Sequence, residues 1–440
     1  MADPAVAPAL RKRDARLDVF RGMALVTIFV THAPGNFYEN YTIRSWGFSD
    51  AAEAFVLMSG ISAGIAYSPS FRAKGAALLS AAGRVWKRAW TLYLVQMLIT
   101  LAALAVAAGA ARFLQAPDLM YKHGIATLFR DPLGFLIGVP LLTHQLGYIN
   151  ILPLYIVLLL VAPVLIFVGM RWPVWLLAGS ALLWGVAGHY QWSLPSYPGG
   201  GGWFLNPMTW QMIFVVGLIV GFRTRSGLGP WRHLKWLRWV ALAFLLLSLA
   251  WREWPALGTM GNHGLWLANE AGLSRVFTSF SKNYLAAPRL FHAIALLGVV
   301  SGFALFRWIA ERKVMFPFAL LGKQSLAVFA LGSVLDYAIQ AIKSITGEDI
   351  VMDSLLLGGG LIILVAFAAS ITYWPKPPKP TPAPAPTAAT APSAMPQQTP
   401  QPAPAAAPRP APVTATVEAA APRWPLLVRA LNGLRPKQTF

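Results

Sequence analysis

The sequence predicts an all-α, polytopic membrane protein of about ten transmembrane helices, each about 20 residues long. Of the 440 residues, 56% are hydrophobic and only 12% are charged, which is roughly half the charged share of an average soluble domain. Long apolar runs recur along the chain, and basic residues concentrate in the segments between alternate runs. These three observations together indicate that lipid covers most of the protein surface.

Ten apolar runs are the predicted spans. Most of them reach the ~20 residues that cross ~30 Å of hydrocarbon. They comprise residues 18–35, 50–68, 89–110, 147–169, 172–190, 207–223, 236–252, 289–308, 316–342 and 354–374. A further run, Leu133–Thr143, is too short to cross, so we interpret it as re-entrant or interfacial. The segment Trp251–Pro288 is predicted to be a long outer loop.

Basic residues orient these spans. They cluster before span one and between spans two and three, six and seven, and eight and nine, for example at Arg16, Arg88, Arg225 and Arg312. Lys and Arg favour the cytoplasmic side, so both termini are predicted to be cytoplasmic. The net charge of +20 is therefore interpreted as an orientation signal at a lipid surface, and no nucleic-acid partner is expected.

The chain divides into three predicted parts. Residues 1–16 form a cytoplasmic N-terminal segment and residues 17–374 form the membrane domain. Residues 375–440 begin with a Pro/Ala-rich stretch that cannot bury a core, so a disordered cytoplasmic tail is predicted, with a short amphipathic helix at its end. Cysteine is absent, which excludes thiolate metal sites and an acyl-cysteine intermediate. No metal site is predicted.

Span one carries three polar residues that need a reason to lie in a membrane: Asp18, Arg21 and His32. Arg21 and His32 are separated by eleven positions, about three helical turns, so they share one face about 16 Å apart. A guanidinium at the inner end can hold phosphates, and an imidazole deeper in the membrane can accept a proton from a hydroxyl. Alternatively, Arg21 is only an orientation anchor and His32 a packed residue with one hydrogen bond.

Span two opens with Asp50 and Glu53, which share a helix face because they lie three positions apart. Both are expected near the outer end of the span, at about the depth of His32. A carboxylate beside an imidazole fixes its tautomer and raises its basicity. The alternative is that these carboxylates are solvated by the outer headgroups.

Arg-x10-His in a first transmembrane helix resembles the signature of the membrane acyltransferase-3 superfamily. Longer strings are similar to its OpgC branch, at residues 13–25, 47–56, 58–60, 144–148, 150–155 and 206–211. The resemblance implies a bacterial inner-membrane enzyme of about ten helices that transfers succinyl groups from succinyl-CoA to periplasmic glucans. It implies His32 as the catalytic residue and Arg21 as its partner, with Asp50 and Glu53 added from geometry.

Further site residues are proposed with less support. Arg16 and Asp18 are expected to assist Arg21 in binding acyl-CoA, which is a co-substrate rather than a tightly bound cofactor. Candidates for substrate contact are His144, Gln145, Asn150, Asn262, His263 and Arg289. A structural role is an open alternative for each of them.

A second functional class stays open. A transporter or flippase of a polysaccharide, lipid or acyl donor would also use buried histidine and carboxylates, as a proton relay. Transporters often contain internal repeats, and we find none, which weakens this alternative. A non-catalytic scaffold would leave Asp18, Arg21, His32 and Glu53 without a reason to be buried. The sequence predicts no particular oligomeric state.

Overall fold

A computed structural model describes residues 15–72, 74–227, 235–347 and 349–374. The chain divides into a unit Met1–Lys376 and a unit Pro377–Phe440, and all the described residues belong to the first. The predictions for residues 1–14, for the Pro/Ala-rich tail and for its terminal helix therefore lie outside the described residues.

The described part of the chain is helical and contains no β-strand beyond one isolated bridge between Pro195 and Gly202. The α-helices are α1 (Ala15–Thr31), α2 (Ile43–Trp46), α3 (Ala51–Tyr67), α4 (Ala76–Phe113), α5 (Asp118–Tyr121), α6 (Thr127–Arg130), α7 (Pro132–Gly138), α8 (Ile151–Arg171), α9 (Pro173–His189), α10 (Pro207–Arg225), α11 (Leu237–Glu253), α12 (Pro255–Glu270), α13 (Arg275–Thr278), α14 (Ala287–Gly302), α15 (Ala304–Ala310), α16 (Phe316–Lys323), α17 (Ser325–Thr346) and α18 (Ile350–Tyr373). Short 3-10 helices cover Phe37–Tyr41, Ser68–Arg72 and Lys313–Met315.

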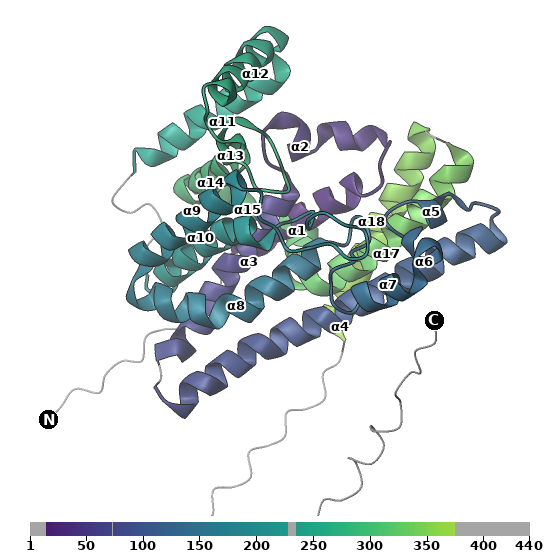
Figure 1. Cartoon of the computed structure of the whole chain (residues 1–440), viewed down its shortest axis with the longest axis horizontal. Helices are drawn as coiled ribbons and strands as arrows, with labels where there is room; N and C mark the ends of the chain where they lie inside the picture. Colours follow the sequence, from purple (N-terminus) through teal and green to yellow (C-terminus); the bar gives the residue numbers. More distant parts are fainter. Residues whose placement is uncertain (1–14, 73, 228–234, 348, 375–440) are drawn as a thin grey trace, which may run out of the picture. The chain divides into compact units, whose positions relative to one another are not determined.

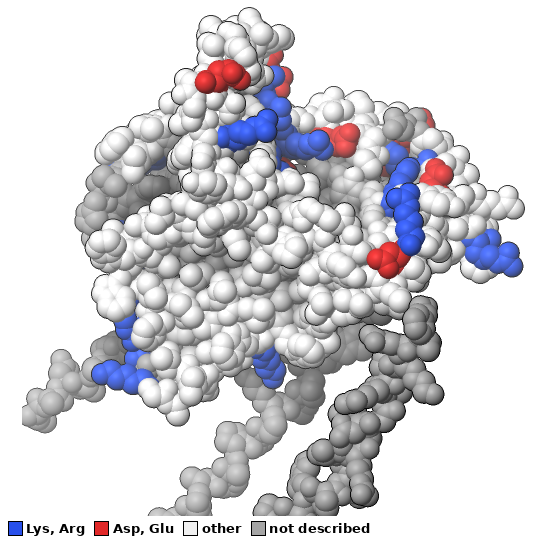
Figure 2. Space-filling model, in the orientation of Figure 1, with Lys and Arg blue, Asp and Glu red and all other residues white. Residues whose placement is uncertain are grey.

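Six of these helices are long and apolar enough to cross a membrane: α3, α4, α8, α10, α17 and α18. Two bent pairs, α11 with α12 and α14 with α15, raise the number to eight in the described residues if each pair is one span. The helices α1 and α9 fall at two further predicted spans but have only 17 residues each. The structure thus supports a membrane protein, while the count of ten stays a prediction. Figure 2 shows a face on which charged side chains lie toward the upper part and the lower edge.

The predicted continuous helix at 316–342 is wrong. The chain breaks at Gln324, so α16 ends at Lys323 and α17 begins at Ser325. The helix α16 packs across α1 at Gly22 and Gly322, where an added Cβ would overlap the backbone of the other helix. The break separates this close contact with α1 from the longer helix that follows.

Span eight is also less regular than predicted, and a second bend follows span seven. The helices α11 and α12 meet at 105° beside Pro255, and α14 and α15 meet at 79° beside Gly302. Proline lacks the N–H that would continue the ladder of the preceding helix, so it begins α12 instead. The predicted outer loop Trp251–Pro288 therefore contains a helix of 16 residues.

Helix α1 occupies the middle of the helical body, in contact with α3, α16 and α17 (Figure 1). The helices α3 and α10 pack closely because a side chain at any of four facing glycines would overlap the backbone of the other helix. These glycines are Gly60 and Gly64 in α3 and Gly217 and Gly221 in α10. Small residues are the usual means of close helix packing in membranes.

The segment that follows α1 is held by a buried ion pair. Lys343 Nζ in α17 lies 2.5 Å from Asp353 Oδ1 in α18. The same ammonium donates to the carbonyl of Gly35 at 3.1 Å, and the same carboxylate accepts from the N–H of Phe37 at 3.0 Å. Both partners are buried, so the chain directly after His32 is fixed to two long helices.

Candidate active site

A cavity of about 760 Å³ surrounds the last turn of α1, and we call it the His32 cavity. Its volume falls within the range of ligand-sized pockets, ~300–1,000 Å³. Segments that were predicted to face the outer side converge on it. Its polar lining includes His32, Asp50, Gln145, Asn150, Lys282 and Arg289. Three of the six residues proposed from the sequence as substrate contacts, Gln145, Asn150 and Arg289, thus meet in one place.

A smaller cavity of about 170 Å³ lies toward the other end of α1, and we call it the Arg21 cavity. Arg21 and Arg88 line it, together with three serines, two tyrosines and apolar side chains, but no Asp or Glu does. Two guanidiniums with neighbouring hydroxyls suit phosphate groups or polar amides. The cavity is smaller than a typical site for a whole ligand, so it would enclose only part of a large molecule.

Phe329 in α17 lines both cavities. Its side chain is buried, and its ring centroid lies 6.3 Å from that of Phe55 in α3. One aromatic ring therefore stands where the two cavities approach each other. The positions of Arg21 and His32, predicted to lie about three turns apart along one face of α1, correspond to two cavities that share this wall.

His32 faces Asp336 of α17, a residue not predicted as part of the site. His32 Nδ1 lies 3.6 Å from Asp336 Oδ2, and 18% of the histidine side chain is exposed. This distance is too long for a hydrogen bond, and His32 Nδ1 and Asp336 Oδ1 are buried with no hydrogen-bond partner among the described residues. The ring of Tyr148 lies 4.9 Å from the imidazole, centroid to centroid. The carboxylate beside His32 is thus Asp336, where we expected Glu53.

A second histidine, His123, lines the same cavity. Gln340 of α17 joins the two histidines, because its Nε2 donates to the His32 carbonyl at 2.7 Å and its Oε1 lies 2.6 Å from His123 Nε2. The amide oxygen can only accept, so His123 Nε2 carries a proton. Burial lowers the pKa of His123 below its ordinary value, although the hydrogen bond with Gln340 acts in the opposite direction. Burial therefore favours the neutral form of this loop imidazole.

Asp50 and Glu53 begin α3 as a capping box. The Asp50 side chain accepts from the N–H of Ala52 at 2.8 Å, and Glu53 Oε2 accepts from the N–H of Asp50 at 3.0 Å. This arrangement satisfies free N–H groups at a helix start. It also fixes the direction of both carboxylates, whose remaining oxygens point to cations rather than to His32.

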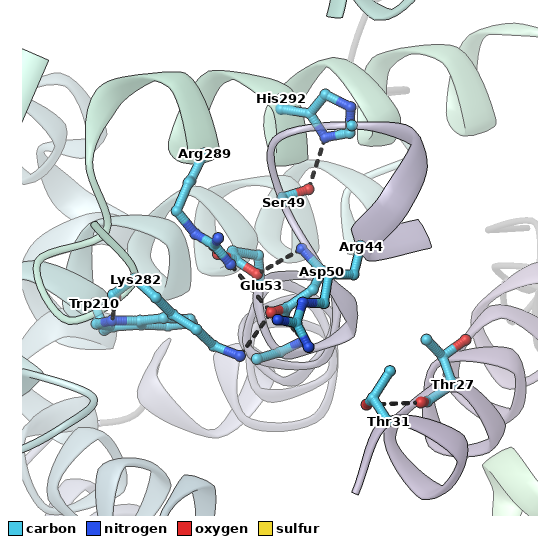
Figure 3. A network of polar contacts seen from close by, with 12 residues as sticks. Thr27, Thr31, Arg44, Ser49, Asp50, Glu53, Trp210, Lys282, Arg289 and His292 are labelled. Atoms are coloured by element: carbon cyan, nitrogen blue, oxygen red, sulfur yellow. Dashed lines mark hydrogen bonds and ion pairs between the residues drawn. The ribbon is translucent and has the colours of Figure 1, made fainter. Parts of the chain in front are cut away.

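Two cations converge on these carboxylates (Figure 3). Lys282 Nζ lies 2.6 Å from Asp50 Oδ2, and Arg289 Nη2 lies 3.1 Å from the same oxygen. Arg289 Nη2 also lies 2.6 Å from Glu53 Oε1. Glu53 is fully buried behind Arg289 and does not line the cavity, whereas Asp50 does. Glu53 is consequently placed to hold Arg289, and Asp50 to shape the cavity wall.

Arg21 is the predicted phosphate ligand that lines the Arg21 cavity. It donates to Ser62 Oγ, lies 3.5 Å from the Gly322 carbonyl oxygen and lies 3.8 Å from Asp18 Oδ1. Asp18 is buried and contacts Arg21 without lining the cavity. Arg16 instead donates to the carbonyls at the end of α14, Val300 and Ser301, each at 3.3 Å. The structure therefore brings Asp18 to Arg21, and it places Arg16 in a larger cavity of about 1950 Å³ that Arg21 also lines.

The other sequence candidates separate into two groups. Gln145 and Asn150 line the His32 cavity, whereas His144 lies beside it with Nε2 2.9 Å from the Gly124 carbonyl. Asn262 and His263 lie on α12, where Asn262 accepts from the Trp251 indole at 3.2 Å. Neither of these α12 residues lines the cavity. Within the described ranges, no three His, Asp or Glu side chains gather as metal ligands.

Sequence reasoning did not place Arg88, His123 or Phe329 in these cavities, nor Asp336 beside His32. Asp336 carried a usable signal, because it is an acidic residue inside an apolar run and such residues are costly in a membrane. Arg88 resembled one more orientation charge in a basic segment. Phe329 and His123 gave no signal, since their roles depend on which helices and loops pack together.

The fold and the two cavities define a helical membrane protein with a histidine-centred polar site. The family model described as OpgC protein matches residues 13–376, so the chain belongs to the OpgC family. The match covers the helical part and leaves out the Pro/Ala-rich tail. No curated protein and no solved structure matches the chain. The family assignment indicates an acyltransferase.

Proposed function

We propose that this protein is a transmembrane O-acyltransferase that moves an acyl group from cytoplasmic acyl-CoA to hydroxyl groups of a periplasmic glucan. The resemblance described above favours succinyl as the acyl group and the bacterial inner membrane as the location, with both termini inside. The observation that carries the proposal is the pair of cavities on α1. The Arg21 cavity is lined by two guanidiniums, the His32 cavity is lined by His32, His123 and Asp50 among other residues, and Phe329 lines both.

In this proposal the donor spans the two cavities. Its phosphates lie near Arg21 and Arg88, and its pantetheine arm leads along α1 toward His32. The helical rise places Arg21 and His32 about 16 Å apart, so an extended arm is required to bring the thioester to the imidazole. Because the Arg21 cavity is only about 170 Å³, the nucleotide end would lie outside it.

The acceptor hydroxyl enters the His32 cavity from the opposite side. The imidazole takes the hydroxyl proton while the oxygen attacks the thioester carbonyl, which forms a tetrahedral intermediate. Its collapse breaks the C–S bond, and the imidazolium returns the proton to the leaving thiolate of coenzyme A. The products are an ester and free coenzyme A, and no cysteine is needed. Tyr148 and Asn150 line the cavity and carry donors for the oxyanion.

The local geometry assigns the ring nitrogens. Asp336 stands at Nδ1 of His32, so Nε2 is left as the proton acceptor, as in other carboxylate-oriented histidines. The present separation of 3.6 Å would have to shorten in the substrate complex, since catalytic hydrogen bonds often tighten only there. Gln340 restrains the backbone at His32, which limits how far the imidazole can turn.

The test is mass spectrometry of periplasmic glycans from strains that contain or lack this protein. Acyl transfer predicts glycans that differ by whole acyl units, and the mass of that unit names the donor. If the two strains contained glycans with the same degree of acylation but in different amounts, this result would contradict the proposal and support a transporter. Restoration of the mass difference by the wild-type chain, but not by His32→Gln, is the matched control.

A further inference from the structure

The wall of the His32 cavity carries more positive than negative charge. Its charged lining residues are Arg44, Asp50, Arg252, Lys282 and Arg289. Even when the buried Glu53 behind Arg289 is counted with Asp50, four cations face two carboxylates, which leaves a surplus of two positive charges.

The surplus is located at Arg44 and Arg252. Lys282 and Arg289 make ion pairs with Asp50 and Glu53, whereas neither Arg44 nor Arg252 forms one with an acid in the described ranges. Arg252 is nevertheless held in place, because Nε donates to the Gly47 carbonyl at 3.1 Å and Nη2 donates to the carbonyl of Arg44 at 3.0 Å.

Arg252 is thus fixed against the backbone of Arg44, and neither guanidinium forms an ion pair with a described carboxylate. An incoming anion would supply the missing negative charge. Lys282 extends the same positive wall inward. It uses a single described ion pair at Asp50, while an ammonium has three donors. Arg44, Arg252 and the remaining donors of Lys282 therefore form a candidate anion-binding wall.

We propose that Arg44, Arg252 and Lys282 bind the free carboxylate of a dicarboxylic acyl group and so select the acyl donor. This inference rests on the acyl transfer proposed above. A thioester carbonyl held at His32 points its acyl chain into the same cavity, and a four-carbon dicarboxylic chain ends in a carboxylate. Arginine and lysine bind carboxylates through charge-assisted hydrogen bonds. A neutral acyl chain of equal length would leave the cations unpaired.

Arg289 is excluded as the selecting residue, although the sequence suggested it as a substrate contact. Its guanidinium Nε and Nη2 are already occupied by Glu53 and Asp50 at 2.6–3.1 Å. Its loss would uncover a buried carboxylate and disturb the fold. Arg44 and Arg252 are exposed at the cavity, so their side chains can be neutralised without leaving a buried charge.

The experiment compares two acyl donors of equal chain length, succinyl-CoA and butyryl-CoA, with a neutral β-glucan oligosaccharide as acceptor. Full-length wild type, Arg252→Gln, Arg44→Gln and Lys282→Met are assayed as purified proteins in lipid. The control is Arg275→Gln, because Arg275 is exposed on α13 and lines none of the cavities. The readout is the ratio of kcat/KM for the two donors.

Wild type should favour succinyl-CoA, and each cavity variant should lower that ratio by ~10-fold or more, as expected for loss of a charge-assisted hydrogen bond. Transfer of butyryl should persist, which shows that the variants are folded, and Arg275→Gln should keep the wild-type ratio. An unchanged ratio, or equal loss with both donors, would overturn the inference. A raised KM for the acceptor with an unchanged donor ratio would also overturn it, because it would assign these cations to the acceptor. If wild type used neither donor, the proposed function itself would fail.

Discussion

Asp336 Oδ2 lies 3.6 Å from His32 Nδ1, and the nearer imidazole nitrogen has no hydrogen-bond partner in the described part of the chain. The two residues come from α17 and the end of α1, separated by some three hundred positions in the sequence. A buried carboxylate with an unpaired oxygen is costly, so this contact calls for a function. Orientation of the imidazole is the role that the geometry supports.

Asp336→Asn should lower kcat by ~10–100-fold, the usual cost of removing a partner that orients a reactive histidine. The KM for acyl-CoA should stay nearly unchanged, because Asp336 is remote from the Arg21 cavity. Steady-state kinetics on purified protein measures both constants. Ser333→Ala is the matched control, since Ser333 is buried on the same helix and only bonds its own backbone at Phe329. Equal losses in both variants would indicate a packing role for Asp336.

Glu53 and Arg289 should behave as one buried unit. Removing one partner of such a pair typically costs ~3–5 kcal/mol, because the other charge is left uncompensated. We expect Glu53→Met and Arg289→Met each to lower the thermal stability of the purified protein. The double variant should lose less than the sum of the two single variants. Strictly additive losses in thermal unfolding would contradict the pairing.

Phe329→Ala should widen the passage between the two cavities, through which the pantetheine arm passes in the proposal. The space left by the ring would admit water beside the thioester at His32, so acyl-CoA hydrolysis without acceptor should increase several-fold. Free thiol release measures this hydrolysis. Phe55→Ala serves as the control, because Phe55 packs near Phe329 but lines only the Arg21 cavity. The same hydrolysis rate in both variants would show that Phe329 does not separate the cavities.

Gly322→Ala should destabilise the contact between α16 and α1, since an added methyl would overlap the backbone of Asp18. We expect a lower yield of folded protein and a lower Tm in detergent. A Cβ added at Gly109 on α4 would meet no other atom within 4 Å. Gly109→Ala should therefore be neutral or slightly stabilising, as alanine favours helices. A normal Tm for Gly322→Ala would mean that the helices can move apart at little cost.

Local sequence patterns predicted much of the helical framework. Eight of the ten predicted spans each fall on one helix and the other two each fall on a pair of helices, because long apolar runs in a membrane protein have few alternatives to helix. The bends at Pro255 and Gly302 and the break at Gln324 were not predicted. They depend on how segments pack, as with α16 against α1, and a hydrophobicity pattern does not contain that information.

The candidate site was predicted only in part, because its contacts also depend on how the helices pack. The separation of Arg21 and His32 follows from helix periodicity, and the two residues indeed line different cavities. The partner of His32 could not be chosen by depth alone, because Glu53 and Asp336 both lie in apolar runs. The capping box at the start of α3 and Arg289 turn Glu53 away from His32. Long-range pairing of this kind requires the three-dimensional arrangement.

The central claim is that His32 accepts the proton from the acceptor hydroxyl. The direct measurement is acyl-transfer turnover of purified His32→Gln, compared with wild type at saturating donor and acceptor. Glutamine keeps a hydrogen-bonding side chain but cannot serve as a general base, and the backbone bond from Gln340 to residue 32 is retained. Because a positioned base contributes ~10²–10⁴-fold, turnover should fall by at least ~10²-fold while membrane insertion and acyl-CoA binding persist. Near-normal turnover of His32→Gln would contradict the account, because it would leave His32 with only a packing or hydrogen-bonding role.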